Sequence, residues 1–282
     1  MTMDGEGMPV EPQDGGVPGG TPLLELTGIS KHFGGVRALH EVDLSVRAGE
    51  VVALIGDNGA GKSTLVKIMS GVESPDAGEI RARGEAVRLD SPRAAADAGI
   101  HTVFQDLSLC DNLDAVQNLF LGHERCGGAW TGRRIRRLVM AEQAQRVLQS
   151  LSVKLRSLTA PVSELSGGQR QGIAICRALI SDPAVVLLDE PTAALGVSQR
   201  AEVLDLVDRL REQGRGVVVI SHDMKDVRQV ADRIVALRLG AKVAEFERDG
   251  YTPSDLVSAM TGAHEPGTHE RSRDGRRGGE AP

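Results

Sequence analysis

The sequence predicts an α/β fold in which helices flank a parallel β-sheet, a smaller antiparallel sheet lies beside it and a helical segment is inserted. Near-continuous apolar runs predict the parallel strands, because both faces of such strands are buried. Runs that alternate apolar with polar residues predict half-buried antiparallel strands. A long stretch without strand patterns predicts the helical insertion.

Three apolar runs predict the central strands of the parallel sheet. They are "VVALIG" (51–56), "VVLLDE" (185–190) and "VVVISH" (217–222). Each is short and leads into polar residues, as buried strands of α/β proteins do. The polar residues at their ends are therefore the first candidates for a functional site, because ligands of open α/β sheets bind at the carboxyl ends of the strands.

The antiparallel sheet is predicted from "LLELTGI" (23–29), "HEVDLSV" (40–46) and "EIRARGEAVRL" (79–89), in which apolar and polar residues alternate. The strand signal then disappears from about Asp106 to Ser163. Within that stretch, "AEQAQRVLQSL" (141–151) spaces Ala, Val and Leu at helical intervals. We therefore expect a helical subdomain over about 106–176.

The two ends of the chain differ in composition from the region between them. Residues 1–22 are rich in Gly, Pro and acidic side chains, and residues 264–282 are charged and rich in Gly. Such segments cannot bury enough apolar surface to offset the entropy of ordering, so we expect disordered tails. Residues 23–263 are expected to form the folded unit, since 40% hydrophobic content suffices for a core in a chain of this size.

Charge argues against binding to nucleic acid. The net charge is −6 and the isoelectric point is near 5.7, whereas nucleic-acid binders usually carry a basic face. The basic cluster "TGRRIRR" (131–137) is interpreted as solvent-facing, because short charge runs usually are.

The cellular compartment is predicted from the cysteines and from the absence of a membrane-spanning run and of a secretory signal. Cys110, Cys126 and Cys176 match no zinc or disulfide spacing and are expected to be incidental free thiols, as in cytosolic proteins. No apolar run reaches the length of a membrane span, and residues 1–20 lack the pattern of a secretory signal. We therefore expect the chain to stay in the cytoplasm.

A phosphate-binding loop follows the first predicted parallel strand. The stretch "GDNGAGKST" fits G-x-x-x-x-G-K-[ST] between a strand and the helical pattern "LVKIMSG". Its glycines let backbone N–H groups surround phosphate oxygens, and the following helix adds partial positive charge. Lys62 is expected to reach the β and γ phosphates, and Ser63 to offer its hydroxyl to Mg²⁺. The predicted nucleotide-binding residues are Gly56, Asp57, Asn58, Gly59, Ala60, Gly61, Lys62, Ser63 and Thr64.

Asp57 would repel a triphosphate unless its carboxylate points away, so the loop amides are expected to do most of the binding. The alternative interpretation of the whole stretch is an ordinary Gly-rich turn.

Two carboxylates end the second parallel strand. Asp189 could hold Mg²⁺ through water, and Glu190 could polarise a water molecule that attacks the γ phosphate. By themselves the two residues are equally typical of an exposed strand end. Together with the phosphate loop they fit one template for phosphoryl transfer.

His222 and Gln105 are expected at the same edge of the sheet. His222 ends the third parallel strand, where it could contact the γ phosphate, although a lone histidine more often serves a structural hydrogen bond. Gln105 follows the strand-like "IHTVF" and is placed to touch Mg²⁺ or the attacking water. The predicted catalytic residues are thus Glu190, His222 and Gln105, and the predicted metal-contacting residues are Ser63, Gln105 and Asp189.

Five short motifs stand in a fixed order, and together they closely resemble the ATP-binding cassette of ABC transporters. They are "GDNGAGKST", "VFQD", "LSGGQ", "VVLLDEPTAAL" and "VISHD", and the resemblance covers roughly residues 23–263. It implies a P-loop NTPase core similar to RecA, an antiparallel β subdomain before it and a helical subdomain that carries "LSGGQ". It also implies ATP and Mg²⁺ as cofactors.

The resemblance gives "LSGGQ" a role. Ser166, Gly167 and Gly168 are expected to cap the helix "QRQGIAICRALI", leaving N–H groups free for an anion. The resemblance implies that Ser166, Gly167, Gly168 and Gln169 contact the γ phosphate of ATP bound by a second cassette, in a head-to-tail dimer. Side chains at 167 and 168 would block that phosphate. The alternative is an ordinary Ser-Gly helix cap.

Further positions carry over one at a time. Phe33 in "KHFGGVRAL" matches the aromatic residue that stacks on adenine, where Tyr is commoner in the family. Gln105 matches the glutamine that senses Mg²⁺ and the membrane partner, Glu190 the general base and His222 the switch histidine. Gly196 departs from the family, in which many members have Asp, and this puts the usual contacts of this loop across the dimer in doubt.

Within the family, three segments resemble ATPases that drive import of simple sugars of the ribose, xylose and fructose class. They are "PTAALGVSQ", "ISHDMKDVRQVADRIVALRLGAKVAE" and "YTPSDLVSAMTGA". The resemblance implies a single cassette that pairs with a second one, a separate transmembrane permease and, indirectly, an extracytoplasmic sugar-binding protein. It places the chain on the cytoplasmic face of the membrane as a peripheral subunit.

Three other functions compete with this one. A soluble ABC ATPase of translation or chromosome maintenance would carry tandem cassettes, long coiled coils or basic surfaces. A regulatory GTPase would share the phosphate loop but would need an N-K-x-D motif, and "LSGGQ" would go unexplained. An inactive binding module is disfavoured because Lys62, Gln105, Asp189, Glu190 and His222 are all present.

Overall fold

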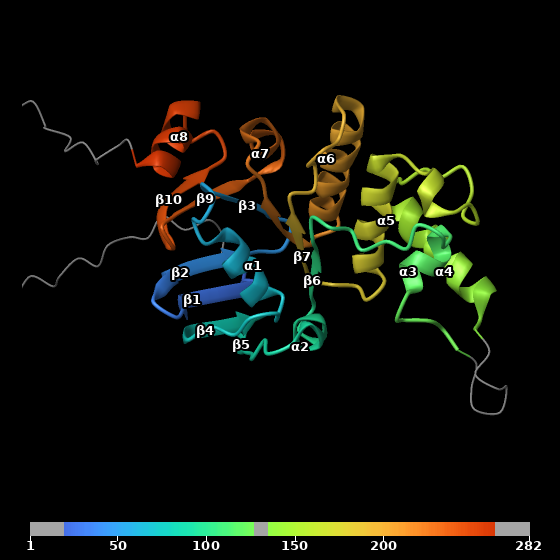
Figure 1. Cartoon of the computed structure of the whole chain (residues 1–282), viewed down its shortest axis with the longest axis horizontal. Coiled ribbons are helices and arrows are strands. Elements are labelled where there is room, and N and C mark those ends of the chain that lie inside the picture. Colours follow the sequence, from blue (N-terminus) through green and yellow to red (C-terminus); the bar gives the residue numbers. More distant parts are fainter. Residues whose placement is uncertain (1–19, 127–134, 263–282) are drawn as a thin grey trace, which may run out of the picture.

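The predicted apolar runs form the centre of a six-stranded sheet in a computed structural model that describes residues 20–126 and 135–262 (Figure 1). Both predicted tails lie outside the described residues, except residues 20–22. Residue 263 and residues 131–134 of the basic cluster also lie outside them. In spatial order the strands are β10 (Ala241–Glu247), β9 (Arg233–Arg238), β3 (Val51–Ile55), β8 (Gly216–Ile220), β7 (Val185–Asp189) and β6 (Ile100–Val103).

The sheet is parallel from β9 to β6, and β10 pairs antiparallel at its edge. The parallel strands at residues 51–55, 185–189 and 216–220 confirm the prediction from the apolar runs. The sequence analysis did not predict β9 and β10 as strands. These two strands extend the sheet beyond β3, and β10 forms its edge.

The second sheet is antiparallel, as predicted. Its order is β2 (Val36–Val46), β1 (Leu24–Phe33), β4 (Ala77–Ala82) and β5 (Glu85–Ala86). Leu26 pairs with Leu44 on one side and with Ile80 on the other, so three buried side chains line one face. In Figure 1 this sheet, in blue and cyan, lies beside α1 (Lys62–Met69) and below the parallel sheet.

Alternate residues of the parallel strands face two different layers. Val185 and Leu187 join an apolar cluster with α1 and the antiparallel sheet. Val186 and Leu188 join a second cluster with the helices on the other side. Because successive side chains of a strand point to opposite faces, the near-continuous apolar run serves both layers. The four helices that complete these layers are α2 (Pro92–Asp97), α6 (Val197–Glu212), α7 (Met224–Val230) and α8 (Pro253–Thr261).

The helical region lies at one end of the molecule, on the right in Figure 1. It comprises α3 (Ala115–Phe120), α4 (Arg137–Ser150), the short 3₁₀ helix η2 (Val162–Glu164) and α5 (Gly167–Leu179). The predicted helical run 141–151 falls on α4, whose Met140, Ala144 and Leu148 are buried at helical spacing. Phe120 is fully buried in the same cluster as these residues.

Cys110, Cys126 and Cys176 are free thiols. Cys176 is buried on α5, and burial raises the pKa of its thiol to about 12, so it behaves as a core side chain. Among the helices in the described ranges, none combines the length and the apolarity needed to cross a membrane.

Candidate active site

The predicted phosphate loop occupies the turn between β3 and α1. Gly56 and Gly61 have φ angles of 148° and 104°. A Cβ at Gly56 would lie 2.3 Å from the carbonyl oxygen of Leu237, and one at Gly61 would lie 2.8 Å from that of Ala38. Both positions therefore require glycine for two reasons: the φ angle is positive, and a neighbouring backbone carbonyl leaves no room for a Cβ.

Lys62 is held at the centre of this loop. Its Nζ donates to the carbonyl oxygens of Gly56, at 2.5 Å, and of Asp57, at 3.0 Å. Partial burial lowers the pKa of Lys62, while the charges of Glu190, Asp57 and Asp189 act in the opposite direction. The ammonium group therefore lies in the field of the carboxylates that end β7.

The remaining loop residues differ in exposure. Asp57, Asn58 and Gly59 are exposed at the tip, and Ala60 is buried behind them, where its carbonyl accepts from the N–H of Gly240 at 3.1 Å. On the first turn of α1, Ser63 is exposed and Thr64 is half-buried.

Asp189 and Glu190 lie at the carboxyl end of β7. Burial raises the pKa of Asp189, the charge of Glu190 raises it further, and Lys62 lowers it. Glu190 has φ 49°, a left-handed conformation that few residues other than glycine adopt, and its N–H donates to the carbonyl of Ile220 at 3.0 Å. This hydrogen bond ties the predicted base to the end of β8, where the chain continues to His222.

His222 contacts Glu190 directly. Its Nδ1 lies 2.9 Å from Oε1 and 2.8 Å from Oε2 of Glu190. The His222 side chain is 73% exposed and that of Glu190 only 16%, so the imidazole covers the carboxylate from the solvent side. The structure thus joins two of the three predicted catalytic residues in one contact.

Gln105 follows a strand of the parallel sheet, whereas Phe33 belongs to the antiparallel sheet. Gln105 is exposed and follows β6, the strand next to β7. Phe33 ends β1 with its side chain 45% exposed, and the Nζ of Lys31 lies 5.4 Å from its ring centroid. The structure gives no direct contact between either residue and Lys62, Glu190 or His222 among the described hydrogen bonds and ion pairs.

Oxygen donors of the kind that Mg²⁺ prefers are available at this edge. Ser63 offers a hydroxyl, Gln105 an amide oxygen and Asp189 a carboxylate whose ionised form is disfavoured by burial. Within the described ranges, no group of three or more His, Cys, Asp or Glu side chains could hold a metal by itself. This set, with one carboxylate and two neutral oxygens, fits a magnesium ion that is also held by nucleotide phosphates.

"LSGGQ" begins α5, as expected. Ser166 is the N-cap: its Oγ accepts from the N–H of Gln169 at 3.3 Å, and Oε1 of Gln169 accepts from the N–H of Ser166 at 3.0 Å. This reciprocal pair is a capping box. Nε2 of Gln169 also donates to the carbonyl of Lys154 at 3.0 Å, which holds the cap against the preceding loop.

The two glycines pack against α6 and the turn before it. A Cβ at Gly168 would lie 3.0 Å from Oε2 of Glu202, a flexible side-chain end, and 3.3 Å from Cβ and 3.4 Å from Cα of Gln199. A Cβ at Gly167 would lie 2.7 Å from a methyl group of Leu195, a flexible side-chain end. Close packing is thus a reason for glycine at 168 that the sequence analysis, which considered only access for phosphate, missed.

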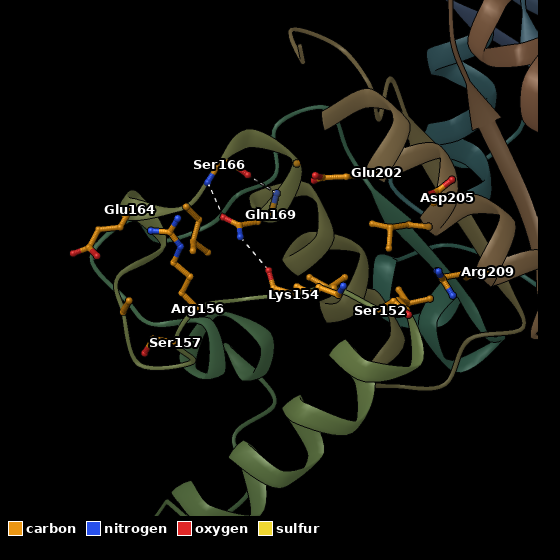
Figure 2. A pocket seen from close by; sticks show the side chains of 16 residues that line it. Ser152, Lys154, Arg156, Ser157, Glu164, Ser166, Gln169, Glu202, Asp205 and Arg209 are labelled. Carbon is orange, nitrogen blue, oxygen red and sulfur yellow. Dashed lines mark hydrogen bonds between the residues drawn. The ribbon is translucent and has the colours of Figure 1, made fainter. Parts of the chain in front are cut away.

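A pocket of about 790 Å³ lies beside the signature (Figure 2). Lys154, Arg156 and Ser166 come from its loop side, and Glu202, Asp205 and Arg209 of α6 line the other side. No residue of the phosphate loop lines this pocket. The signature and the phosphate loop of one chain therefore do not share this pocket.

Two arginines at functional loops were missed by the sequence analysis. Arg177 of α5 donates to the carbonyl oxygens of Leu107, at 2.7 Å, and of Ser108, at 2.9 Å, just beyond Gln105. Arg200 of α6 forms ion pairs with Asp223 and Asp226, just beyond His222. Arginines in helical patterns are usually solvent-facing, so no local signal marks these two.

Comparison with known proteins agrees with this geometry. A family model described as ABC transporter matches residues 39–193. The fructose import ATP-binding protein FrcA of Rhizobium meliloti is 44% identical over 250 residues, which cover 87% of this chain and 96% of the relative. The xylose/arabinose import ATP-binding protein XylG of Sulfolobus acidocaldarius is 39% identical, with 85% and 94% covered. The ribose import ATP-binding protein RbsA of a Jannaschia species is 41% identical over 87% of this chain but 47% of its own length.

Solved structures have the same fold. A nucleotide-free ATP-binding cassette from an ABC transporter superposes with a TM-score of 0.73 at 25% identity, covering 87% of this chain and 96% of that one. A dimeric cassette in a post-hydrolysis state, bound to ADP and phosphate, has a TM-score of 0.66 at 29% identity, with 81% and 100% covered. The resemblance drawn from the five motifs is thereby confirmed: the chain belongs to the ABC transporter family, as an ATP-binding cassette.

Proposed function

We propose that this chain is the ATP-hydrolysing subunit of an ABC importer for a simple sugar. The observation that carries the proposal is the 44% identity to a fructose import ATP-binding protein over 96% of that relative's length. Two further relatives at 39% and 41% identity are named for import of pentose sugars. The contact between Glu190 and His222 beside the phosphate loop supports an active enzyme.

In this proposal the loop from Gly56 to Thr64 binds the phosphates of ATP, with Lys62 at the β and γ phosphates. Phe33 stacks on the adenine through its exposed ring. Ser63, Gln105 and Asp189 would hold Mg²⁺, which would neutralise charge on the phosphates.

Glu190 is the general base of the proposed reaction. Its carboxylate accepts the proton of the attacking water, and His222 positions the carboxylate and reaches toward the γ phosphate. Gln105 orients the water and signals to the membrane partner.

The complete site is proposed to need a second copy of the chain. Ser166, Gly167, Gly168 and Gln169 of one copy would contact the γ phosphate bound by the other. Two observations support this: the signature pocket contains no residue of the chain's own phosphate loop, and a structurally similar cassette is dimeric with ADP and phosphate.

The partners beyond the dimer are a transmembrane permease and, indirectly, an extracytoplasmic sugar-binding protein. The subunit would lie at the cytoplasmic face of the membrane, and the helical region over about 106–176 would contact the permease. ATP binding would close the dimer and hydrolysis would reset it. A soluble ABC ATPase of translation or chromosome maintenance is the second candidate, and the import names of the relatives disfavour it.

The test is to express tagged Glu190→Gln protein in its native cell, stabilise it with ATP, solubilise the membranes gently and identify the co-purifying proteins. The expected partner is a multi-span permease, and tagged Lys62→Ala protein treated in the same way is the control for capture that depends on nucleotide. Ribosomal or DNA-associated partners without a membrane protein would overturn the importer and favour the soluble class.

A further inference from the structure

We propose that Arg200 is a positioning residue for ATP hydrolysis, which holds the segment carrying His222 against the helix that follows Glu190. The inference rests on the proposed function, because its consequence is a change in turnover. It concerns a residue outside every motif of the sequence.

Arg200 lies in the first turns of α6 and reaches α7. Its Nη1 contacts Oδ2 of Asp223 in a short hydrogen bond and lies 3.4 Å from Oδ1 of Asp226. Asp223 is the N-cap of α7, and Asp226 is in the first turn of that helix. One guanidinium group therefore bridges two carboxylates at the start of the helix that follows His222.

The backbone on both sides of His222 is held in place. The N–H of Asp223 donates to Oγ of the buried Ser221 at 3.0 Å, and Oδ1 of Asp223 accepts from the N–H of Lys225 at 2.9 Å. Arg200 binds the other carboxylate oxygen of Asp223. A change at Arg200 is thus transmitted to the residue next to His222.

The same arginine is tied to the loop that begins at Glu190. The N–H of Ala193 donates to the carbonyl of Glu190 at 3.1 Å, and the N–H of Arg200 donates to that of Gly196 at 2.9 Å. Since Glu190 also contacts His222, the chain of contacts closes into a ring. The segment after β7 and the segment after β8 thus meet twice. Glu190 contacts His222 at one point, and the Arg200 side chain contacts Asp223 at the other.

The arrangement is poorly suited to a purely stabilising role. Asp226 is 4% exposed, and its Oδ2 has no hydrogen-bond partner in the described part of the chain. A buried carboxylate with an unsatisfied oxygen carries a desolvation cost that an apolar pair would avoid. In the pair with Asp223, the Arg200 side chain is 33% exposed and that of Asp223 28%, where an ion pair adds little stability. Stability therefore does not explain the cluster of Arg200, Asp223 and Asp226. Orientation of the loops that carry Glu190 and His222 does explain it.

The test compares steady-state hydrolysis of MgATP by the purified full-length chain with that of Arg200→Gln and Arg200→Lys. We expect Arg200→Gln to lower kcat about 10-fold while KM changes less than about twofold, because misplacing a catalytic group affects the chemical step more than binding. Lysine keeps the charge without the fork geometry, so Arg200→Lys should recover part of kcat.

Arg211→Gln is the matched control for a loss of stability. Arg211 lies at the other end of α6 and pairs with Asp208, at 2.8 Å, and with Asp232, at 3.1 Å, far along the helix from His222. Its loss should lower the thermal stability by a similar amount to that of Arg200→Gln and leave kcat unchanged. An equal fall of kcat in both variants would overturn the proposal.

A double-variant cycle with Asp223→Asn tests the route of the effect. If Arg200 acts through Asp223, combining Arg200→Gln with Asp223→Asn lowers kcat no further than the more severe single change. Losses that multiply, or a kcat of Arg200→Gln equal to wild type, would overturn the inference while the proposed function stands. A wild-type chain that neither binds nor hydrolyses ATP would instead overturn the proposed function.

Discussion

Nδ1 of His222 lies 2.8–2.9 Å from both carboxylate oxygens of Glu190, so two loops from neighbouring strands meet at one contact. β7 and β8 are adjacent and parallel, and Asp189 is in register with Ile220. The residues that follow these strands must therefore emerge side by side. The contact follows from the register, and it brings together a base and a group that can orient it.

Glu190→Gln should abolish turnover and leave ATP binding intact. Glutamine has nearly the same shape and can still hydrogen-bond to His222, but it cannot accept a proton from water. We expect kcat to fall at least about 100-fold, the range for removal of a general base. Size-exclusion chromatography with ATP should show a dimer that persists; a monomer under conditions in which the wild type dimerises would contradict this role.

Lys62→Ala should weaken nucleotide binding and hydrolysis together. The ammonium group supplies charge-assisted hydrogen bonds, so its loss should cost about 1.5–3 kcal/mol, or roughly 10- to 150-fold in affinity. The exposed Lys67 on the same helix is the matched control, and Lys67→Ala should bind ATP as the wild type does. Calorimetry measures both; unchanged affinity and full activity of Lys62→Ala would reject the assignment of the phosphate loop.

Gly167→Ala separates access for phosphate from close packing. The added methyl would meet flexible side-chain ends of Leu195 and Gln199, so the free energy of unfolding should change by less than about 1 kcal/mol. ATP-dependent dimerisation should be lost, because the methyl would lie where the proposed dimer places the phosphate of the second cassette. Normal dimerisation and turnover of Gly167→Ala would mean that glycine at 167 is not needed for contact with a phosphate.

Gly168→Ala gives the contrasting result. Its methyl would meet Oε2 of Glu202, which can move aside, and then Cβ and Cα of Gln199 on α6, which cannot move as a side-chain end can. We expect a loss of about 1 kcal/mol in the free energy of unfolding, measured by denaturant titration. If the variant were as stable as the wild type, the packing of α5 against α6 would not require glycine at 168.

Asp189→Asn should stabilise the protein without nucleotide and abolish Mg²⁺-dependent hydrolysis. Burial and the charge of Glu190 raise the pKa of Asp189, so the folded protein favours the neutral form. The ionised carboxylate then costs stability above that raised pKa, and the cost disappears as the pH falls to the ordinary value of the carboxyl. Asparagine should thus stabilise the fold at about pH 7 and have a smaller effect at about pH 4.

The measurement is chemical denaturation of Asp189→Asn and wild type at both pH values, with Asp205→Asn on the exposed face of α6 as control. A stability difference that grows toward acid pH, or a destabilised Asp189→Asn at neutral pH, would contradict the origin given for the pKa shift.

Much of the fold was predictable because the signals are local. Runs 51–56, 185–190 and 217–222 predicted three parallel strands, since burial on both faces leaves an apolar run. The alternating runs 23–29, 40–46 and 79–89 predicted the second sheet. β10 was not predicted, because it is an edge strand in which most side chains are exposed or half-buried. β9 lies inside the sheet and is almost fully buried, but its apolar run is only four residues long and arginines bound it on both sides, so it was missed.

The sequence by itself determined which chemistry is available: the order of the five motifs, the glycines of the phosphate loop and the capping box that Ser166 and Gln169 form across three residues. These are contacts within a few residues, so spacing along the chain defines them. Tertiary structure decided that Arg200 meets Asp223 and that α6 closes on Gly168. Such contacts join helices far apart in the chain, and they depend on where the packed layers place each helix, which no local pattern records.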